Sequence, residues 1–440
     1  MDPRNRYLLS RAVAAAATAS ALRPPTRFAR AATPLEFVVG VPVSELPLQT
    51  AAVTGALAAL GAARGRATGW RGAVGLGLAA ATGGGLWRLH RDAQDAERVL
   101  EAALVDGLGP AYRDTITEPF APAPATPLSR RSILAPALPR RRRYTAAGAD
   151  LSYGDAGRRN RVDIWKRADL PDDARAPVLL QVHGGAWMVG EKQGQAYPLM
   201  THLAERGWVC VAINYRLSPR ATWPDHIADV KRAIDWTRRT IGEHGGDPDF
   251  LAITGGSAGG HLTALAALTP GVTAFQPGFE DADTSVAAAV PFYGVYDFTD
   301  RHGGANPGLE PLLARHVFKT DLAEDRPTWD AASPMSHVGP DAPPFFVIHG
   351  TNDTIVPVEQ ARSFTGMLGA VSREPVVYAE LPRAQHAFDV LPSVRTHHTV
   401  HAVERFLAVV RSRHGGETPA EAVDAADSVA VADPVDADST

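Results

Sequence analysis

Short apolar runs alternate with amphipathic segments along residues 147–413. The apolar runs, typical of buried strands, are RVDIW (161–165), PVLLQVHG (177–184), WVCVAINY (208–215), FLAIT (250–254), VAAAVPFYG (286–294), PFFVIHG (344–350) and PVVYAEL (375–381). Helical periodicity predicts intervening helices at about 195–206, 226–241 and 258–268, and a long closing helix over 393–413. Continuous apolar strands separated by helices indicate an α/β fold, in which a parallel sheet is covered on both faces.

The N-terminal region follows a different pattern. Two apolar runs, 46–63 and 72–87, consist mostly of small residues, and Arg64, Arg66 and Arg71 lie between them. Each run is at or just below the ~17–25 residues that a membrane-spanning helix needs, and alanine and glycine partition weakly into lipid. A membrane hairpin, a soluble helical hairpin and a disordered segment all remain open. The first predicts a membrane-associated or cell-envelope protein that contacts lipid through residues 46–91, and the alternative location is cytoplasmic.

Composition divides the chain into three parts. Residues 1–145 form the helical Ala/Gly-rich region, which ends in a Pro- and Arg-rich linker at 118–144; dense proline resists both helix and sheet pairing. Residues 146–414 form the regular α/β domain. Residues 415–440 are acidic and lack aromatic residues, so they cannot bury enough apolar area to fold. We expect this last part to be a disordered tail.

Net charge and cysteine content give no indication of a nucleic-acid partner or of a disulfide-dependent fold. The 440 residues carry a net charge of −4, which gives no reason to expect a nucleic-acid partner. Cys210 is the single cysteine, so the fold cannot depend on an intrachain disulfide. Because Cys210 lies inside a strand-like apolar run, we interpret it as a small buried hydrophobe rather than a nucleophile.

The segment TGGSAGGHL, residues 254–262, carries the first chemical signal. It places Ser257 between glycines, directly after the apolar run FLAI and before the helix-like run HLTALAAL. A G-x-S-x-G sequence between a strand and a helix is typical of a nucleophile elbow, in which a strained turn exposes the serine Oγ. The following helix N-terminus favours developing negative charge. The alternative is a glycine turn with a capping serine.

A serine nucleophile needs a base, and the base needs an acid to orient it. Asp353 follows the run PFFVIHG, and His386 follows PVVYAEL. Both positions lie at the carboxyl ends of predicted strands, where function gathers in parallel α/β sheets. Asp297 also follows a strand-like run and is the rival acid. We prefer Asp353 because its strand is the nearest in sequence to His386.

An oxyanion hole must stabilise the tetrahedral intermediate. HGGAW, residues 183–187, follows the run PVLLQV, and its glycines allow backbone N–H groups to approach a substrate closely. We predict that Gly184, Gly185 and Ala258 donate these hydrogen bonds. His183 is expected to brace the loop beside the substrate, and Trp187 to line the substrate pocket, with a packing role as its alternative.

Taken together, these segments resemble a known family. HGGAW, NYRLSP (214–219), WPDHIADVKRAIDW (223–236), GGSAGGHL, HGTNDTIVP (349–357) and QHAF (385–388) are similar to the α/β-hydrolases of the hormone-sensitive-lipase-like or carboxylesterase type. The nearest resemblance is to actinobacterial Lip-type esterases and isoprenylcysteine methylesterase-like proteins. It implies an eight-stranded, mostly parallel sheet, hydrolysis of small-molecule esters and no cofactor. The usual HGGG sequence reads HGGA here, and Gly256 replaces the usual acidic residue, which leaves the substrate range open.

The sequence thus predicts a serine hydrolase of short-to-medium-chain carboxylic esters acting through an acyl-enzyme. Because HGGAW is also similar to arylformamidases, an amide or formamide hydrolase is one alternative, and a non-catalytic ligand-binding protein on the same fold is another. The histidines at 397, 398 and 401 have partly metal-like spacing, but no H-E-x-x-H sequence accompanies them. We therefore predict no metal site there.

Overall fold

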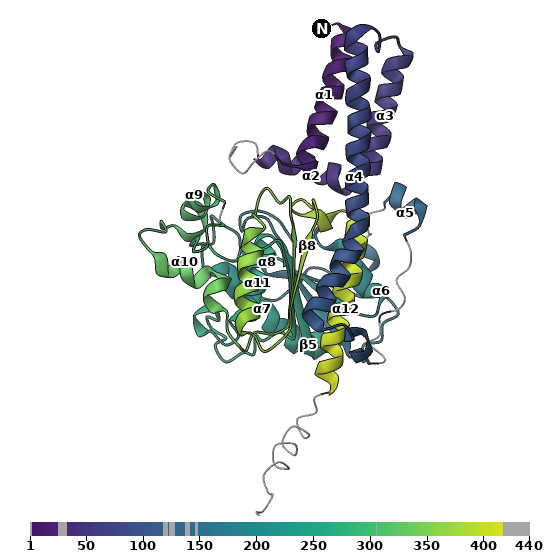
Figure 1. The fold of residues 1–440 in the computed structure, drawn as a ribbon. Coiled ribbons are helices and arrows are strands. Elements are labelled where there is room, and N and C mark those ends of the chain that lie inside the picture. The colour runs from purple at the N-terminus through teal and green to yellow at the C-terminus, as the bar shows by residue number, and fades with distance from the viewer. Residues whose placement is uncertain are drawn as a thin grey trace, which may run out of the picture.

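The computed structural model describes residues 2–24, 33–117, 122, 128–136, 141–145, 148–304 and 306–416. Figure 1 shows a helical projection standing on a body of sheet and helices. We call the projection the stalk; it consists of α1 (Pro3–Leu22), α2 (Thr33–Glu45), α3 (Pro47–Ala63) and residues 69–91 of α4 (Gly69–Leu108). From residue 417 onward, the predicted acidic tail lies outside the described residues.

One eight-stranded sheet forms the centre of the body, in the order β1-β2-β4-β3-β5-β6-β7-β8. The strands are β1 (Leu151–Ser152), β2 (Arg161–Trp165), β3 (Ala176–Val182), β4 (Val209–Ile213), β5 (Gly246–Gly256), β6 (Ala288–Phe292), β7 (Phe345–Gly350) and β8 (Val376–Leu381). β2 pairs antiparallel with β1 and with β4, and the remaining pairs are parallel. The predicted mostly parallel, eight-stranded sheet is confirmed.

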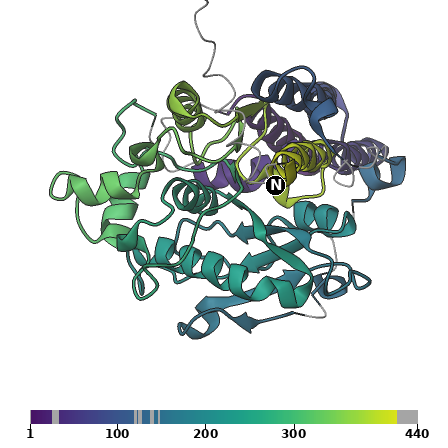
Figure 2. The ribbon, with the colours of Figure 1, turned by 90° about the horizontal axis from the view of Figure 1, so that it is seen from below.

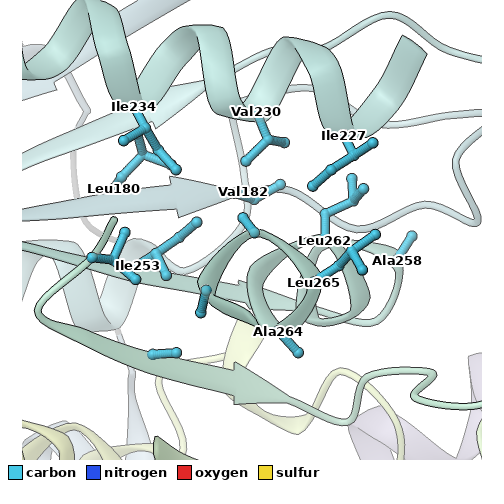
Figure 3. Close-up of a cluster of buried hydrophobic side chains, with 14 of the residues drawn as sticks. Leu180, Val182, Ile227, Val230, Ile234, Ile253, Ala258, Leu262, Ala264 and Leu265 are labelled. Carbon is cyan, nitrogen blue, oxygen red and sulfur yellow. The ribbon is translucent and has the colours of Figure 1, made fainter. Parts of the chain in front are cut away.

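Two apolar layers cover the sheet, because successive strand residues point to opposite faces. In β3, Val178, Leu180 and Val182 belong to one buried cluster, and Leu179 belongs to the other. The first cluster is completed by α7 (Asp225–Thr240), α8 (Ala258–Leu268) and α11 (Glu359–Val371), and the second by α6 (Tyr197–Glu205) and α12 (Val394–Gly416). Figure 2 shows helices on both faces, and Figure 3 shows the first cluster where α7 and α8 meet the sheet.

The short helices lie outside these layers. They are α5 (Arg130–Leu134), which precedes the body, and α9 (Leu309–Leu313) and α10 (Arg326–Ala332), which belong to the long insertion after β6. Figure 1 shows α9 and α10 at the side of the body away from α6. The insertion packs onto the first apolar cluster through Leu313 and Trp329, both buried.

Helix α4 joins the stalk to the body without a break. Its second half buries Ala96, Leu100 and Leu104 in the same cluster as α12 and Val377 of β8. This packing differs from the expected division of the chain at residue 145. The second half of α4 is part of the core of the body, although a proline-rich segment separates it from the strands in sequence.

The stalk helices pack through small residues. The Tyr7 ring lies against Gly75 of α4, where an added Cβ would come within 2.6 Å of the ring. Among the residues that the structure describes, no single helix combines the length and apolar character needed to cross a membrane. The segment 36–45 and α3 meet that test only as a pair, with a bend of 98° between them.

A buried ion pair fastens the stalk to the body. The Glu45 carboxylate at the end of α2 accepts hydrogen bonds from the Arg395 guanidinium and from Ser393 Oγ, the latter at 2.9 Å. Both charged side chains have 0% exposure. A second pair joins Arg383 to Asp92 of α4, with 2.8 Å between Nη1 and Oδ2. Removing one partner from the fully buried pair would leave a charge without solvation.

The first prediction concerns this anchor. Glu45→Ala is expected to lower the free energy of unfolding by about 3–5 kcal/mol, because Arg395 is left buried and unpaired. Urea unfolding of the full chain, followed by tryptophan fluorescence, measures the change. Asp341→Ala is the matched control, since its pair with Arg373 is exposed and such pairs contribute about 0–1 kcal/mol. Equal effects of the two substitutions would contradict the prediction.

Candidate active site

Ser257 occupies a strained turn between β5 and α8. Its φ of 60° and ψ of −123° lie in a region that residues with side chains rarely adopt. The turn is held by the Ser257 N–H, which donates to the Phe292 carbonyl oxygen at 3.0 Å. Glycine at 255 allows the close packing, since a Cβ there would lie 2.6 Å from the Val182 carbonyl oxygen. The structure thus contains the strand, turn and helix that the sequence predicted around this serine.

His386 and Asp353 meet at the same edge of the sheet. The His386 Nδ1–H donates to Asp353 Oδ2 at 2.7 Å, and the Asp353 side chain has 0% exposure. Its other oxygen accepts from the backbone N–H groups of Ile355 and Val356 at 2.9 and 2.8 Å. Burial alone would raise the pKa of Asp353, but the neighbouring imidazoles of His386 and His349 outweigh it and hold the pKa well below its usual value.

The rival acid is engaged elsewhere. Asp297 accepts hydrogen bonds from the backbone N–H groups of Thr299 and Arg301 at 3.0 and 2.7 Å. It also pairs with the Arg301 guanidinium at 3.2 Å. Its contacts therefore stabilise the start of the insertion after β6, whereas Asp353 is the acid that contacts His386.

Two residues of this site were missed by sequence reasoning. The Tyr293 ring packs against the His386 imidazole, with 4.6 Å between centroids, and a Cβ on Gly256 would lie 2.6 Å from its Oη. Tyr293 therefore connects the serine turn to the histidine. Gln385 Oε1 accepts from the N–H groups of Thr354 and His386, both at 2.8 Å, and so ties the acid loop to the histidine loop. The available signal for Tyr293 was its place near the end of the apolar run VAAAVPFYG. For Gln385 the signal was its position next to His386 in the sequence.

The HGGAW loop lies beside the nucleophile. A Cβ on Gly184 would come within 3.2 Å of the Ser257 Cβ. The Gly184 N–H, however, donates to Gln195 Oε1 at 2.7 Å, so its role as an oxyanion donor stays a prediction. Gln195 comes from the loop before α6, which sequence pattern could not place next to Gly184. Gly185 has φ of 125°, and Ala258 begins α8, where N–H groups lack intrahelical acceptors.

His183 and Trp187 are enclosed by protein. The His183 side chain stacks on Tyr215 with 4.3 Å between ring centroids, and burial lowers its pKa to about 4. The Trp187 Nε1–H donates to His261 Nδ1 at 3.1 Å, and its residue exposure is 3%. This enclosure fits the bracing role expected of His183 and the packing alternative given for Trp187, and contact of either side chain with substrate stays a prediction. Their rings fill the core beneath the loop and brace it.

One histidine of the closing helix lies in a polar cluster. His202, His401 and Glu404 each place one ligand atom within 4.8 Å of the others. His202 Nε2 lies 2.6 Å from Glu404 Oε2, and Arg206 Nε lies 3.6 Å from Glu404 Oε1. The Glu404 carboxylate of α12 is thus engaged by His202 of α6 and by Arg206, and these contacts join the two helices. The absence of a functional metal at these histidines stays a prediction.

Similar proteins of known class show the family to which this chain belongs. The family model BD-FAE matches residues 162–368. The probable carboxylic ester hydrolase LipM of Mycobacterium tuberculosis is 51% identical over 417 residues, covering 94% of this chain and 96% of that protein. The chain belongs to the Lip-type carboxylic ester hydrolases.

More distant relatives agree with this assignment of the Lip-type hydrolase. The isoprenylcysteine alpha-carbonyl methylesterase ICME of Arabidopsis thaliana is 30% identical and covers 52% of this chain and 54% of that protein. A solved carbohydrate esterase from gut microbiota, in truncated form, shares the fold with a TM-score of 0.52 at 24% identity, covering 61% of this chain and 99% of that one. The predicted resemblance, the α/β-hydrolase fold and the class of carboxylic ester hydrolase are confirmed at the level of the family.

The second prediction follows from three buried histidines of this Lip-type hydrolase. Burial lowers the pKa of His183 and His226 to about 4 and that of His261 to about 3. At pH values between these pKa values and the usual ~6.5, the three histidines bind protons in the unfolded chain but not in the folded protein. The free energy of unfolding therefore keeps its full histidine contribution above pH ~6.5 and falls as the pH drops below it.

Urea unfolding from pH 7.5 to 4.5 measures this loss. Each histidine is expected to contribute up to ~1.4 kcal/mol per pH unit. In His183→Gln, the free energy of unfolding should fall less steeply as the pH is lowered. In His302→Gln, the pH dependence should be the same as in wild type, because His302 is exposed. A free energy of unfolding that is flat across this pH range would refute the prediction.

Proposed function

We propose that the chain is a serine carboxylesterase whose catalytic residues are Ser257, His386 and Asp353. The observation that supports this most directly is the 2.7 Å hydrogen bond between His386 and the buried Asp353, at the sheet edge that carries the strained Ser257 turn. Because Nδ1 donates to Asp353, the lone pair of Nε2 is left to accept the Ser257 proton. Tyr293 and Gln385 position the imidazole and do not take part in proton transfer.

The reaction proceeds in two halves. Ser257 Oγ bonds to the ester carbonyl carbon while its proton passes to His386 Nε2. The tetrahedral intermediate collapses, the bond to the alcohol oxygen breaks, and His386 returns the proton to that oxygen. Water then repeats the sequence on the acyl-enzyme and releases the acid. Asp353 keeps the imidazole oriented and stabilises its charged form throughout.

Backbone N–H groups stabilise the oxyanion. We assign this role to Gly185 and Ala258, since the Gly184 N–H is occupied by Gln195 in the structure. Donors fixed by a glycine loop and a helix N-terminus need no reorganisation as charge develops. Esters with short-to-medium acyl chains are the proposed substrates.

The third prediction tests the nucleophile and the acid. Ser257→Ala should abolish hydrolysis of p-nitrophenyl esters from acetate to palmitate, and Asp353→Asn should lower kcat by roughly 10⁴-fold because the imidazole loses its orienting partner. Asp297→Asn is the matched control and should retain catalysis. Equal rates in wild type and Ser257→Ala would rule out the triad. Absence of turnover in both proteins would favour an amide substrate or a ligand-binding role.

We further propose that the stalk contacts lipid. Helix α3 contains no charged residue, yet of its residues only Pro47, Ala58 and Gly61 are buried. A helix that is apolar on all sides is normally enclosed by protein or lipid. Exposed large hydrophobic side chains continue around the stalk at Leu9, Val13, Val38, Val53, Leu57, Leu60, Trp70, Val74, Leu76 and Trp87.

Charge along the stalk supports an anionic lipid surface as its partner. Residues 46–91 contain no aspartate or glutamate. Arginines 4, 6, 64, 66 and 71 lie near the end of the stalk that is farthest from the body, where α1 begins and α3 turns into α4 (Figure 1). Such a cluster attracts anionic headgroups, while the apolar flanks below it would enter the acyl region.

The fourth prediction concerns this contact. The full chain is expected to float with vesicles of phosphatidylcholine and phosphatidylglycerol. The double variant Val53→Glu, Leu57→Glu should reduce the fraction of protein that floats at least several-fold, because each carboxylate opposes insertion into lipid. Val371→Glu is the matched control, because Val371 is an exposed apolar residue on α11 of the body. Loss of flotation in the control as well, or retention in the double variant, would contradict lipid contact through the stalk.

A further inference from the structure

Helix α2 lies across the histidine loop. The Phe37 ring meets the His386 imidazole edge-on, with 5.9 Å between centroids and 69° between planes. One turn further along α2, a Cβ on Gly40 would lie 3.3 Å from Gln385 Nε2. Figure 1 shows α2 crosswise at the base of the stalk, between the other stalk helices and the body. The N-terminal region therefore supplies a side chain that touches the proposed catalytic base.

Contacts at the end of α2 and at the end of the preceding helix α1 hold this region against the body. Its last residue, Glu45, is buried against Arg395 and Ser393. The helix before it is fixed as well, because Asn352 Nδ2 donates to the carbonyl oxygens of Ala21 and Leu22, at 2.8 and 3.3 Å. Asn352 directly precedes Asp353. The stalk thus contacts the acid loop through α1 and the histidine loop through α2.

We propose that Phe37 is a specificity-determining residue that bounds the space for the alcohol part of the ester. The inference rests on the proposed function, in which His386 returns a proton to the leaving oxygen. That oxygen must come within ~3 Å of the imidazole nitrogen, so the group attached to it extends over the surface around His386. Phe37 contacts the same imidazole and is only partly buried. The acyl chain extends from the carbonyl carbon in a different direction from the leaving oxygen, so it need not approach Phe37.

This placement predicts selectivity on one side of the ester bond only. Phe37→Ala removes the ring next to the leaving group, and Phe37→Trp enlarges it. The first should therefore favour bulky alcohols, and the second should disfavour them. The acyl-chain preference should stay as in wild type, because no change is made near the carbonyl oxygen. Val38→Ala is the matched control, since Val38 is adjacent on α2 and 64% exposed.

The experiment measures kcat/KM for two ester series with the full chain. One series combines acetate with methanol, butanol, cyclohexanol and 1-naphthol, and the other combines p-nitrophenol with acyl chains from acetate to decanoate. Phe37→Ala is expected to raise the ratio of 1-naphthyl to methyl acetate by about tenfold, as space for a bulky group is worth 10-fold or more. Phe37→Trp should lower that ratio, and Val38→Ala should leave it unchanged.

The other outcomes separate the two proposals. An unchanged alcohol ratio in both Phe37 variants would overturn the inference, and so would a shift in acyl-chain preference. A uniform loss for all esters with an altered pH profile of kcat would also overturn it, because Phe37 would then act as a brace for His386. If turnover by wild type does not depend on Ser257, the proposed function fails and the inference about Phe37 fails with it.

Discussion

The site depends on keeping the Asp353 carboxylate ionised inside the protein. A buried carboxylate without partners would be protonated or would destabilise the fold by several kcal/mol. Here one oxygen accepts two backbone hydrogen bonds, and the other faces His386 and His349. These contacts require the loops after β7 and β8 to lie side by side. Parallel pairing of those two strands provides that arrangement, because it brings both carboxyl ends to one edge of the sheet.

The stalk is coupled to the same loops by contacts of a different kind. Burying the Glu45–Arg395 pair costs desolvation, which hydrogen bonds to the two side chains offset in part. Ser44 and Ser393 supply further bonds to the Glu45 carboxylate. A pair of this kind adds little net stability, but its two charges must stay within hydrogen-bonding distance of each other. It therefore fixes the position of Glu45 at the end of α2. Phe37 and Gly40 then lie over the histidine loop, so the N-terminal region contacts His386 and Gln385.

Sequence reasoning performed well where local pattern and chemistry coincide. The seven apolar runs became strands, because each is long enough to show continuous burial between turn residues. β1 was not found, since its two residues, Leu151 and Ser152, are too short to carry a pattern. Ser257 could be singled out because its glycines are required by the turn itself. The resemblance to Lip-type esterases rested on such short segments, and the relatives confirm it.

The sequence by itself determined the sheet, its helical layers and the strand ends that carry Ser257, Asp353 and His386, because strand burial and turn chemistry are local properties. Tertiary structure alone decided which carboxylate contacts His386, that Gln195 occupies the Gly184 N–H, and that His183 and Trp187 are enclosed. It also decided that residues about 350 positions apart, such as Phe37 and His386, are in contact. These outcomes depend on how separate elements pack, and packing between distant segments leaves no periodic signal along a single chain.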